Sequence, residues 1–289
     1  MRKAILGMVG LLAFGALHAE GSGAQLLRPT SGLPPSFEVA TIKPNNGAFR
    51  LRQMRFSPAN FSAQRYSLKD LIKWAYRIKS DDQLLGGRPW MSTEFYDVIA
   101  KAAENEVEAI DRLDREQAIE RTQLMLQSLL ADRFQLKTSI QKRELPIFAL
   151  VVAKGGPKLK KVQTPPIASP GTQLPPGSRP PGIGTTGESR ITATSCTMDM
   201  MSEWLSQVDE VGARIVLNET GLQGSYDFVL SGVSVASALP PGVTLKGQAS
   251  ENKMSILTAL QEQLGLKLEP RKARVEVLVI ESAERPSPN

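Results

Sequence analysis

Histidine is almost absent from this chain, since His18 is the only one among 289 residues. It lies beside an expected export-signal cleavage site, so cleavage would leave a mature protein without histidine. Serine–histidine–aspartate catalysis, cysteine–histidine catalysis and histidine-ligated zinc are then excluded.

Cysteine is equally scarce, because Cys196 stands alone. An internal disulfide is therefore impossible, whereas a bridge to another chain stays open. We expect Cys196 to act as a small buried hydrophobic residue.

The chain has one long hydrophobic run, and it stands at the N-terminus. Two basic residues precede the apolar run 4–17, and small-residue sites end at Ala19 and Ala24. This pattern is typical of a signal peptide over residues 1–24 and predicts a periplasmic or secreted protein. The run is shorter than the ~20 residues of a membrane span. An uncleaved anchor or a buried N-terminal helix would give a similar pattern.

The net charge of +6 is mild, and the densest basic cluster is Lys158, Lys160 and Lys161. An excess of this size is usual for a solvated surface. We therefore predict no nucleic-acid partner and no stable membrane span after cleavage. A protein or cell-envelope partner is the better expectation.

A stretch rich in proline and glycine, residues 163–189, divides the chain. Such a composition disfavours helices and central strands, and it predicts a semi-extended linker. The linker separates a first unit, residues 33–162, from a second unit, residues 190–289.

The two units show the same order of structural signals when shifted by 130 residues, although their residue identity is near chance. Trp74 corresponds to Trp204, and the pair Tyr96-Asp97 corresponds to Tyr226-Asp227. Each unit is predicted as β-α-β-β-α-β-β. The fold class is therefore α+β, with two duplicated units that each place two helices on one face of a small mixed sheet.

Helix signals recur at equivalent places in the two units. Ser67, with Asp70 three residues later, forms a capping signature, and Thr197 is its counterpart. The stripes that follow have helical spacing: Leu71, Trp74, Ala75 and Ile78, then Met198, Met201, Leu205 and Val208. A second helix is expected over 114–131, and another between a cap at Ser255 and a stop at Gly265.

Strand signals fill the intervals between the helices. Alternating or β-branched runs predict strands over 37–42, 61–65, 82–85, 95–100, 134–140 and 145–153, and then 191–195, 213–217, 226–230, 266–269 and 275–280. Glycines at 221 and 224 suit a turn between two of these strands.

Several longer runs resemble a known family. They are 37–46, 129–138, 145–160, 220–229 and 260–281, with a closing Glu284-Arg-Pro286. Together they resemble the soil-associated family of exported bacterial proteins that carry a domain of unknown function. That resemblance implies no settled activity. Some relatives are fused to membrane metallopeptidase-type sensor proteins, which implies a sensing or binding role.

The second unit also resembles, more weakly, the short N-terminal domain of secretins and TonB-dependent receptors. Those domains bind protein partners in the periplasm. The resemblance rests mainly on hydrophobic pattern.

Two short motifs suggest chemistry that their context does not favour. The glycines of Gly182-Ile-Gly-Thr-Thr-Gly187 fit a dinucleotide fingerprint, but the run lies in the linker without a preceding strand. Ser139 and Lys142 fit the Ser-x-x-Lys pattern of penicillin-recognising enzymes. They fall at a strand end, where residues three apart point to opposite faces.

Acidic and aromatic residues offer weaker candidates. Asp97 and Asp227 could serve acid–base catalysis if they met, or each could cap a turn or pair with a nearby Arg or Lys. The acidic residues Asp81, Asp82, Glu104, Glu106, Glu108, Asp111 and Asp114 lack the spacing of a calcium loop. Trp74, Trp90 and Trp204 could form a binding platform, but Trp74 and Trp204 lie on core-facing helical stripes, which favours core packing.

The sequence thus predicts no catalytic, cofactor-binding or metal-binding residues and no cofactor. The preferred hypothesis is a non-catalytic periplasmic or secreted binding module. One alternative is a carboxylate-based hydrolase of cell-wall or extracellular polysaccharide, and another is an extracytoplasmic ligand-sensing domain. The oligomeric state stays open.

Overall fold

The computed structural model describes residues 25–28, 34–47, 52–162, 182–185, 189–212, 214–233 and 254–286. The expected α+β class is confirmed, with helices packed on three four-stranded sheets. The expected signal peptide, residues 1–24, and most of the expected linker lie outside the described residues. Within them, no helix has both the length and the apolar character that a membrane crossing requires.

Helices and strands alternate along the first part of the chain, and the elements at 53–56, 90–93 and 104–111 are additions to the predicted order. In chain order, the elements are β1 (Phe37–Pro44), β2 (Gln53–Phe56), β3 (Asn60–Ser67), α1 (Leu68–Ala75), η2 (Asp81–Gln83), β4 (Leu84–Gly86), α2 (Trp90–Thr93), β5 (Phe95–Ala102), α3 (Glu104–Asp111), α4 (Arg115–Arg133) and β6 (Lys137–Val152).

The second part repeats much of this order. Its elements are β7 (Lys160–Val162), β8 (Gly182–Thr185), β9 (Arg190–Cys196), α5 (Met198–Leu205), η3 (Asp209–Val211), β10 (Val216–Asn218), β11 (Ser225–Ser231), α6 (Ile256–Ala259), η5 (Leu260–Leu264) and β12 (Leu266–Ser282).

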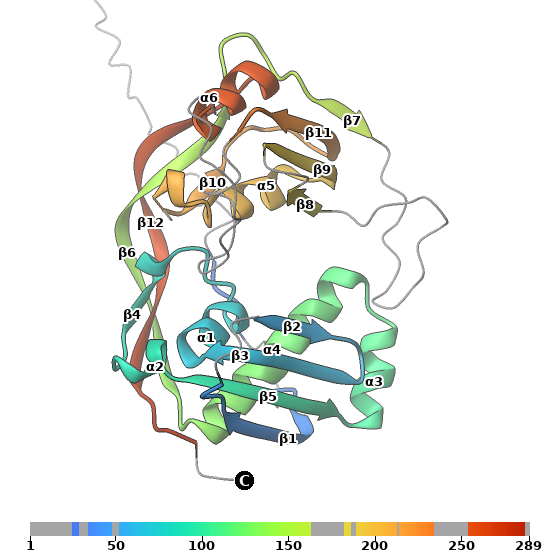
Figure 1. Cartoon of the computed structure of the whole chain (residues 1–289), viewed down its shortest axis with the longest axis vertical. Helices are drawn as coiled ribbons and strands as arrows, with labels where there is room; N and C mark the ends of the chain where they lie inside the picture. Colours follow the sequence, from blue (N-terminus) through green and yellow to red (C-terminus); the bar gives the residue numbers. More distant parts are fainter. Residues whose placement is uncertain are drawn as a thin grey trace, which may run out of the picture.

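The three sheets form two lobes and a bridge. The first lobe holds the sheet β1-β5-β3-β2, and the second holds β7-β11-β9-β8. The middle sheet has the order β10-β6-β12-β4 and draws strands from both parts of the chain. Figure 1 shows its two long strands, β6 and β12, running from one lobe to the other.

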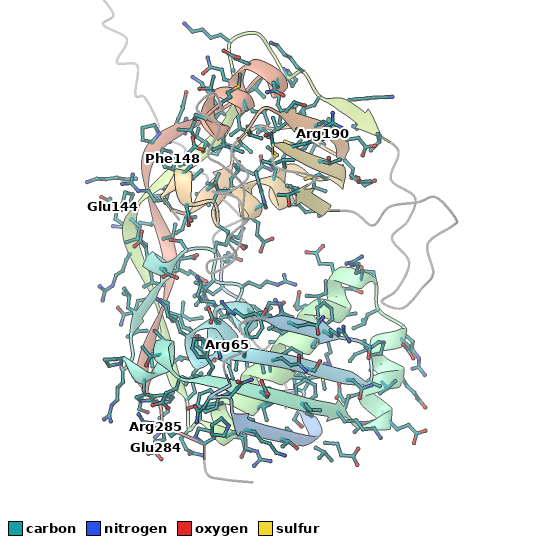
Figure 2. The ribbon with its side chains drawn as sticks, viewed as in Figure 1. Arg65, Glu144, Phe148, Arg190, Glu284 and Arg285 are labelled. Atoms are coloured by element: carbon teal, nitrogen blue, oxygen red, sulfur yellow. The ribbon has the colours of Figure 1, made fainter. Side chains whose placement is uncertain are left out.

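The middle sheet exchanges strands between the two parts. β6 and β12 pair antiparallel along nearly their whole length. β4, from the first part, pairs parallel with β12, whereas β10, from the second part, pairs parallel with β6. Figure 2 marks the span, with Phe148 of β6 beside the second lobe and Arg285, just beyond β12, beside the first. Each part therefore completes the other's sheet.

This shared sheet is the main difference from the sequence-based expectation of one mixed sheet per unit. The last two strands expected in each unit are one continuous strand, β6 or β12. The signals that suggested a break, the charged stretches 141–144 and 269–274, lie in the exposed middle of this two-stranded ladder. One face of the ladder is still buried there, because Ile147, Val275 and Val277 belong to a small core of their own, and the charged side chains lie toward solvent.

The first helix forms for local reasons that the sequence displays. The Ser67 side chain accepts a hydrogen bond from the Asp70 amide at 3.2 Å, and the Asp70 carboxylate accepts one from the Ser67 amide. This capping box satisfies amide groups that a helix start leaves without partners. Leu68, Leu71, Ile72 and Ala75 then face the core of the first lobe.

Each lobe has its own large hydrophobic core. The first contains Phe61, Leu71, Tyr96, Leu130 and Phe134, and it also takes Leu278 and Ile280 from β12. The second contains Ile191, Met201, Leu230 and Leu260, and it takes Leu150 from β6. Each lobe is thus completed by a strand from the other part of the chain.

The expected helix caps and the expected helix stop of the second part are confirmed. Thr197 and Ser255 cap their helices, and Gly265 ends η5 with φ +66°. The linker was expected to hold no central strand, and Gly182–Thr185 forms β8, an outer strand paired with β9. Residues 104–111, whose acidic side chains were considered only for a calcium loop, form helix α3.

Candidate functional site

A pocket of about 260 Å³ lies where α1, β4, α2 and β12 meet. Its lining consists of Lys69, Leu84, Gly86, Gly87, Arg88, Pro89, Met91, Ser92 and Ile280. Buried apolar side chains, Leu84, Met91 and Ile280, supply its floor. The polar groups are two cations and a hydroxyl, and no carboxylate lines the pocket.

Two glycines keep the pocket open at the end of β4. Gly86 (φ +79°) and Gly87 (φ +86°) both adopt the left-handed conformation that favours glycine. A Cβ atom on Gly86 would come within 2.7 Å of the Ile280 carbonyl oxygen, and one on Gly87 within 3.1 Å of the Met91 sulfur. Any side chain at Gly87 would therefore project toward the pocket floor.

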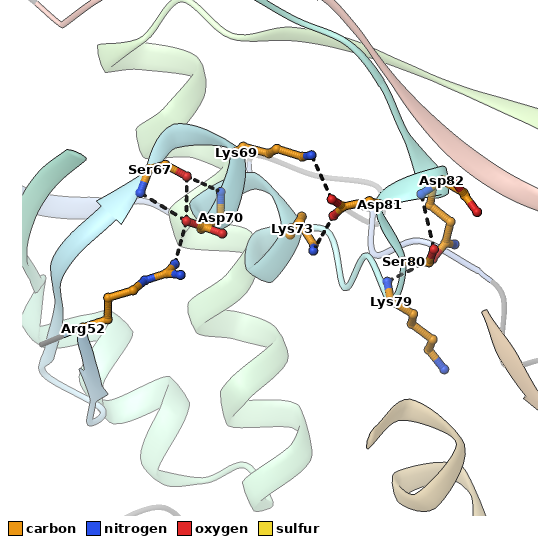
Figure 3. Close-up of polar contacts among 10 residues, drawn as sticks. Arg52, Ser67, Lys69, Asp70, Lys73, Lys79, Ser80, Asp81 and Asp82 are labelled. Carbon is orange, nitrogen blue, oxygen red and sulfur yellow. Dashed lines mark hydrogen bonds and ion pairs between the residues drawn. The ribbon is translucent and has the colours of Figure 1, made fainter. Parts of the chain in front are cut away.

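Lys69 reaches the pocket from the first turn of α1 and is held by a shared carboxylate. Asp81 of η2 bridges Lys69 at 3.0 Å and Lys73 at 2.6 Å, as Figure 3 shows. Burial opposes ionisation of Asp81, but the hydrogen bonds from Lys73 and Lys69 outweigh burial and hold its pKa below the ordinary value. Asp81 is therefore an anion at neutral pH, and it serves two cations at once.

Arg88 is the unneutralised cation of the pocket. It is exposed, and within the part of the chain that the structure describes its guanidinium forms no ion pair. Other arginines of the first lobe do have partners: Arg52 pairs with Asp70 at 2.6 Å, and Arg285 pairs with Glu94 at 2.6 Å. The pocket thus has a positive rim over an apolar floor.

The pocket adjoins an outer strand of the middle sheet. β4 pairs with β12 on one side, and no strand among the described residues pairs with its other side. An outer strand presents backbone N–H and C=O groups to which another extended segment can add. The arrangement therefore offers backbone pairing, an apolar pocket and two cations at one place.

The two aspartates considered for catalysis accept hydrogen bonds from backbone amides instead. Asp97 on β5 accepts hydrogen bonds from the Arg65 amide and the Asn45 side chain, both at 2.8 Å. Asp227 on β11 accepts one from the Ser195 amide at 2.7 Å. They belong to different sheets.

Each aspartate binds the backbone at the same kind of irregularity, a β-bulge in the neighbouring strand. Arg65 (φ +58°) and Ser195 (φ +45°) adopt the left-handed backbone conformation although neither is glycine. Each lies where the strand register shifts. A β-bulge of this kind leaves one amide without a ladder partner, and the carboxylate accepts its hydrogen bond. A turn cap or an ion pair with a nearby Arg or Lys was expected for each aspartate, and the structure shows instead a hydrogen bond from the amide of a β-bulge.

We expect Asp97→Ala to lower the free energy of unfolding by about 1 kcal/mol, because the Arg65 amide loses its acceptor. Asp97→Asn keeps a carbonyl oxygen at the same place and should cost less. Urea denaturation of the two variants measures the difference. Equal losses for both would show that the Arg65 hydrogen bond contributes nothing measurable.

The other motifs do not assemble sites. Ser139 and Lys142 both lie on β6, opposite Val279 and Glu276, so they do not share a helix face as the enzyme pattern requires. Gly182 and Gly184 belong to the outer strand β8 rather than to a loop that opens a helix.

The acidic residues have structural roles where the structure gives them partners. Glu106 pairs with Arg121 at 2.9 Å, Glu108 pairs with Arg112 at 3.7 Å, and Asp114 caps α4. Among the described residues, no group of three acidic, cysteine or histidine side chains is placed to hold a metal ion.

The tryptophans and the cysteine pack against the cores. Trp90 is buried, and Trp74 and Trp204 are partly buried against the first and second cores. Cys196 is buried in the second core, and burial raises the pKa of its thiol to about 12. The expectation of core packing is confirmed for Trp74, Trp204 and Cys196, and Trp90 is also part of the first core.

The comparison with protein families is decisive for classification. A family model described as protein of unknown function (DUF3738) matches residues 69–283. The chain belongs to this family. No curated protein and no solved structure matches the chain.

The DUF3738 match covers the whole pocket, because its lining extends from Lys69 to Ile280. The family description assigns no function, so the resemblance to a family with a domain of unknown function is confirmed only to that extent. Its soil association and the secretin or TonB likeness stay predictions.

Sequence reasoning missed every polar residue of the pocket. Lys69, Arg88 and Ser92 belong to no motif in the sequence. The only local signal was the doublet Gly86-Gly87 between a strand and Pro89, which predicts a sharp turn but not a pocket. The contribution of Ile280 depends on pairing across almost 200 positions, which no local pattern reveals.

Proposed function

We propose that this DUF3738 protein is a non-catalytic binding module that works outside the cytoplasm and takes up an extended segment of a protein partner along β4. The single observation that carries the proposal is the outer strand β4 ending at an apolar pocket with a positive rim. Strand addition of this kind combines backbone hydrogen bonds for affinity with a side-chain pocket for specificity.

The composition of the pocket favours binding over the hydrolytic alternative. A carboxylate-based hydrolase needs two acidic side chains facing each other across its substrate. Here the pocket offers Lys69, Arg88 and Ser92, while Asp97 and Asp227 are engaged with backbone amides. A sensing role would use the same surface and is contained within this proposal.

Export and duplication complete the proposal. Export is supported by the basic and apolar pattern of residues 1–24. An internal duplication is supported by elements that recur about 130 residues apart and by the paired bulges at Arg65 and Ser195. Matching irregularities are a stronger sign of common origin than matching regular strands, because few sequences need them.

Site-directed photo-cross-linking tests the binding role. A photo-cross-linking amino acid is placed at Ser92, which is exposed at the pocket rim, in cells that produce the full chain. The matched control carries the same amino acid at Arg112, whose side chain is 80% exposed on the far end of α3. We expect a discrete adduct from position 92 alone, which co-production of an excess of wild-type chain in the same cells suppresses.

The adduct must also be mapped on the partner. Mass spectrometry of the cross-linked peptide identifies the partner segment next to the pocket. The same adducts from both positions, or none from position 92, would contradict a partner at β4.

A further inference from the structure

Resting on the proposed binding role, we infer that the segment received by β4 carries a carboxylate, which Arg88 and Lys69 bind at the pocket rim, beside an apolar side chain that enters the pocket. The inference follows from three features of the site: the charge balance of the rim, the shape of the floor and the geometry of the strand.

The charge balance of the rim is positive. Three cations lie around the pocket and the neighbouring turn, Lys69, Lys73 and Arg88, and Asp81 is shared between the two lysines. Arg88 has no ion-pair partner among the described residues. A guanidinium can bind both oxygens of one carboxylate, and this planar match is more specific than a point charge.

The floor requires an apolar group next to that carboxylate. Leu84, Met91 and Ile280 are each at most 8% exposed, and they lie below the open backbone of Gly87. A volume of about 260 Å³ accommodates one aliphatic side chain with room at the rim. An inorganic anion or a sugar phosphate would leave this apolar surface without a partner.

The strand geometry favours a peptide over a lipid headgroup. β4 ends at Gly86, directly at the pocket, so a segment paired with β4 would deliver its end or a nearby side chain to the rim. Successive side chains of an extended segment alternate in direction, which places an apolar residue in the pocket and backbone on the strand. The carboxylate could be a C-terminus or an acidic side chain.

Peptide binding to the full chain tests the inference. The probe is Ser-Thr-Val-Thr-Val-Leu with a neutral fluorophore at its N-terminus, because fluorescein would add negative charge. One form has a free C-terminal carboxylate, a second has a C-terminal amide, and a third is amidated with glutamate as its last residue. Fluorescence anisotropy at low salt measures the affinity of each.

We expect one carboxylate form to bind about tenfold more tightly than the neutral amide, the ratio typical of a charge-assisted hydrogen-bonded pair. Tighter binding of the free-carboxylate form would indicate a C-terminal ligand. Tighter binding of the glutamate form would indicate an internal acidic residue. Equal binding of all three would overturn the inference.

Two substitutions with opposite expected signs sharpen the test. In Arg88→Gln the difference between acid and amide peptides should shrink to the part that Lys69 supplies, whereas the matched change Arg112→Gln should leave it intact. Asp81→Asn releases Lys69 and Lys73 from their shared anion and should tighten carboxylate binding about twofold. A misfolded variant could not produce this pattern, because misfolding does not tighten binding.

Failure here is distinguishable from failure of the binding role. If none of the peptides binds but the Ser92 cross-link persists, β4 has a partner and the carboxylate chemistry is wrong. If phosphatidylglycerol vesicles bind through Arg88 and no peptide does, the inference is also overturned, and the cations belong to a membrane-facing surface. If an acidic peptide binds as expected, both proposals are supported.

Discussion

Replacing Gly265 with alanine is expected to lower the free energy of unfolding by about 2–4 kcal/mol. Gly265 ends η5 in the left-handed conformation, with φ +66°, and this alone penalises alanine by about 1–2 kcal/mol. An added Cβ would also overlap the carbonyl oxygen of Gly156 and approach the Lys158 amide at 3.2 Å. Both neighbours are backbone groups that no rotamer change can move aside.

The close approach at Gly265 has a structural purpose. The Lys158 amide donates to the Leu264 carbonyl, and the Ala153 amide donates to the Gly265 carbonyl, both at 2.8 Å. These bonds hold the turn that follows β6 against the start of β12. Since β6 and β12 connect the two lobes, a backbone shift at Gly265 would also disturb the pairing of these two strands.

Gly212→Ala separates the two parts of this penalty. Gly212 also ends a short helix with φ +73°, but a Cβ there would meet nothing within 4 Å. Its substitution should therefore cost only the conformational term, about 1–2 kcal/mol. Equal losses at Gly265 and Gly212 would contradict the contact with Gly156.

The single cysteine provides an independent readout of these variants. Cys196 is buried, and its thiol pKa is about 12, so it should react slowly with alkylating reagents while the second lobe is folded. Its alkylation rate then reports opening of the core. Urea denaturation and Cys196 alkylation should rank wild type, Gly212→Ala and Gly265→Ala in the same order.

Local signals in the sequence were reliable, and long-range pairing was not. The caps at Ser67, Thr197 and Ser255 and the stop at Gly265 depend on a few neighbouring residues, and all four are present. The pairing of β4 with β12 depends on strand exchange between two parts of the chain. Hydrophobic alternation indicates that a strand has a buried face but does not identify its neighbour.

The same limitation explains why the candidate site could not be predicted from the sequence. Its floor combines Leu84 with Ile280, which meet only because β12 crosses into the first lobe. Its rim depends on Lys69 and Arg88, whose types are common on any surface. Arg88 stands out because it lines the pocket without an ion-pair partner among the described residues, a property of the folded chain and not of its sequence.

A second large effect is expected at the N-terminal segment 25–28, which lies before the expected start of the first unit at residue 33. Leu26 and Leu27 are only 4% and 9% exposed, and Leu26 belongs to the first core. The Leu26 amide donates to the Glu276 carboxylate at 2.9 Å, and Arg28 forms an ion pair with the same carboxylate. The segment thus attaches to the bridging strand β12.

The backbone of this segment is also held by the first lobe. The Leu27 amide donates to the Tyr76 carbonyl at 3.2 Å, and the Gln127 side chain donates to the Leu27 carbonyl at 3.1 Å. Gln83 donates to the Glu276 carbonyl at 3.1 Å. This number of hydrogen bonds around four residues indicates that the segment is docked on the fold and is part of the folded structure.

We expect Leu26→Ala to lower the free energy of unfolding by about 2–4 kcal/mol, because it removes a buried side chain from a packed core. The matched control is Leu257→Ala, whose side chain is 41% exposed and whose loss should be below about 1 kcal/mol. Urea denaturation at constant pH measures both. Equal effects would mean that segment 25–28 does not dock in solution.

Glu276 distinguishes the polar part of this docking from the apolar part. Glu276→Leu leaves the buried Leu26 amide without its acceptor and should cost about 1–3 kcal/mol. Glu276→Gln keeps an acceptor oxygen and loses the pair with Arg28, whose side chain is 53% exposed, so its effect should be smaller. If Leu26 and Glu276 act through one docked segment, the double variant Leu26→Ala with Glu276→Leu should lose less than the sum of the single losses. Strict additivity would instead indicate that the two residues stabilise the protein independently, and that β12 is held in the first lobe by Leu278 and Ile280 without help from the N-terminal segment.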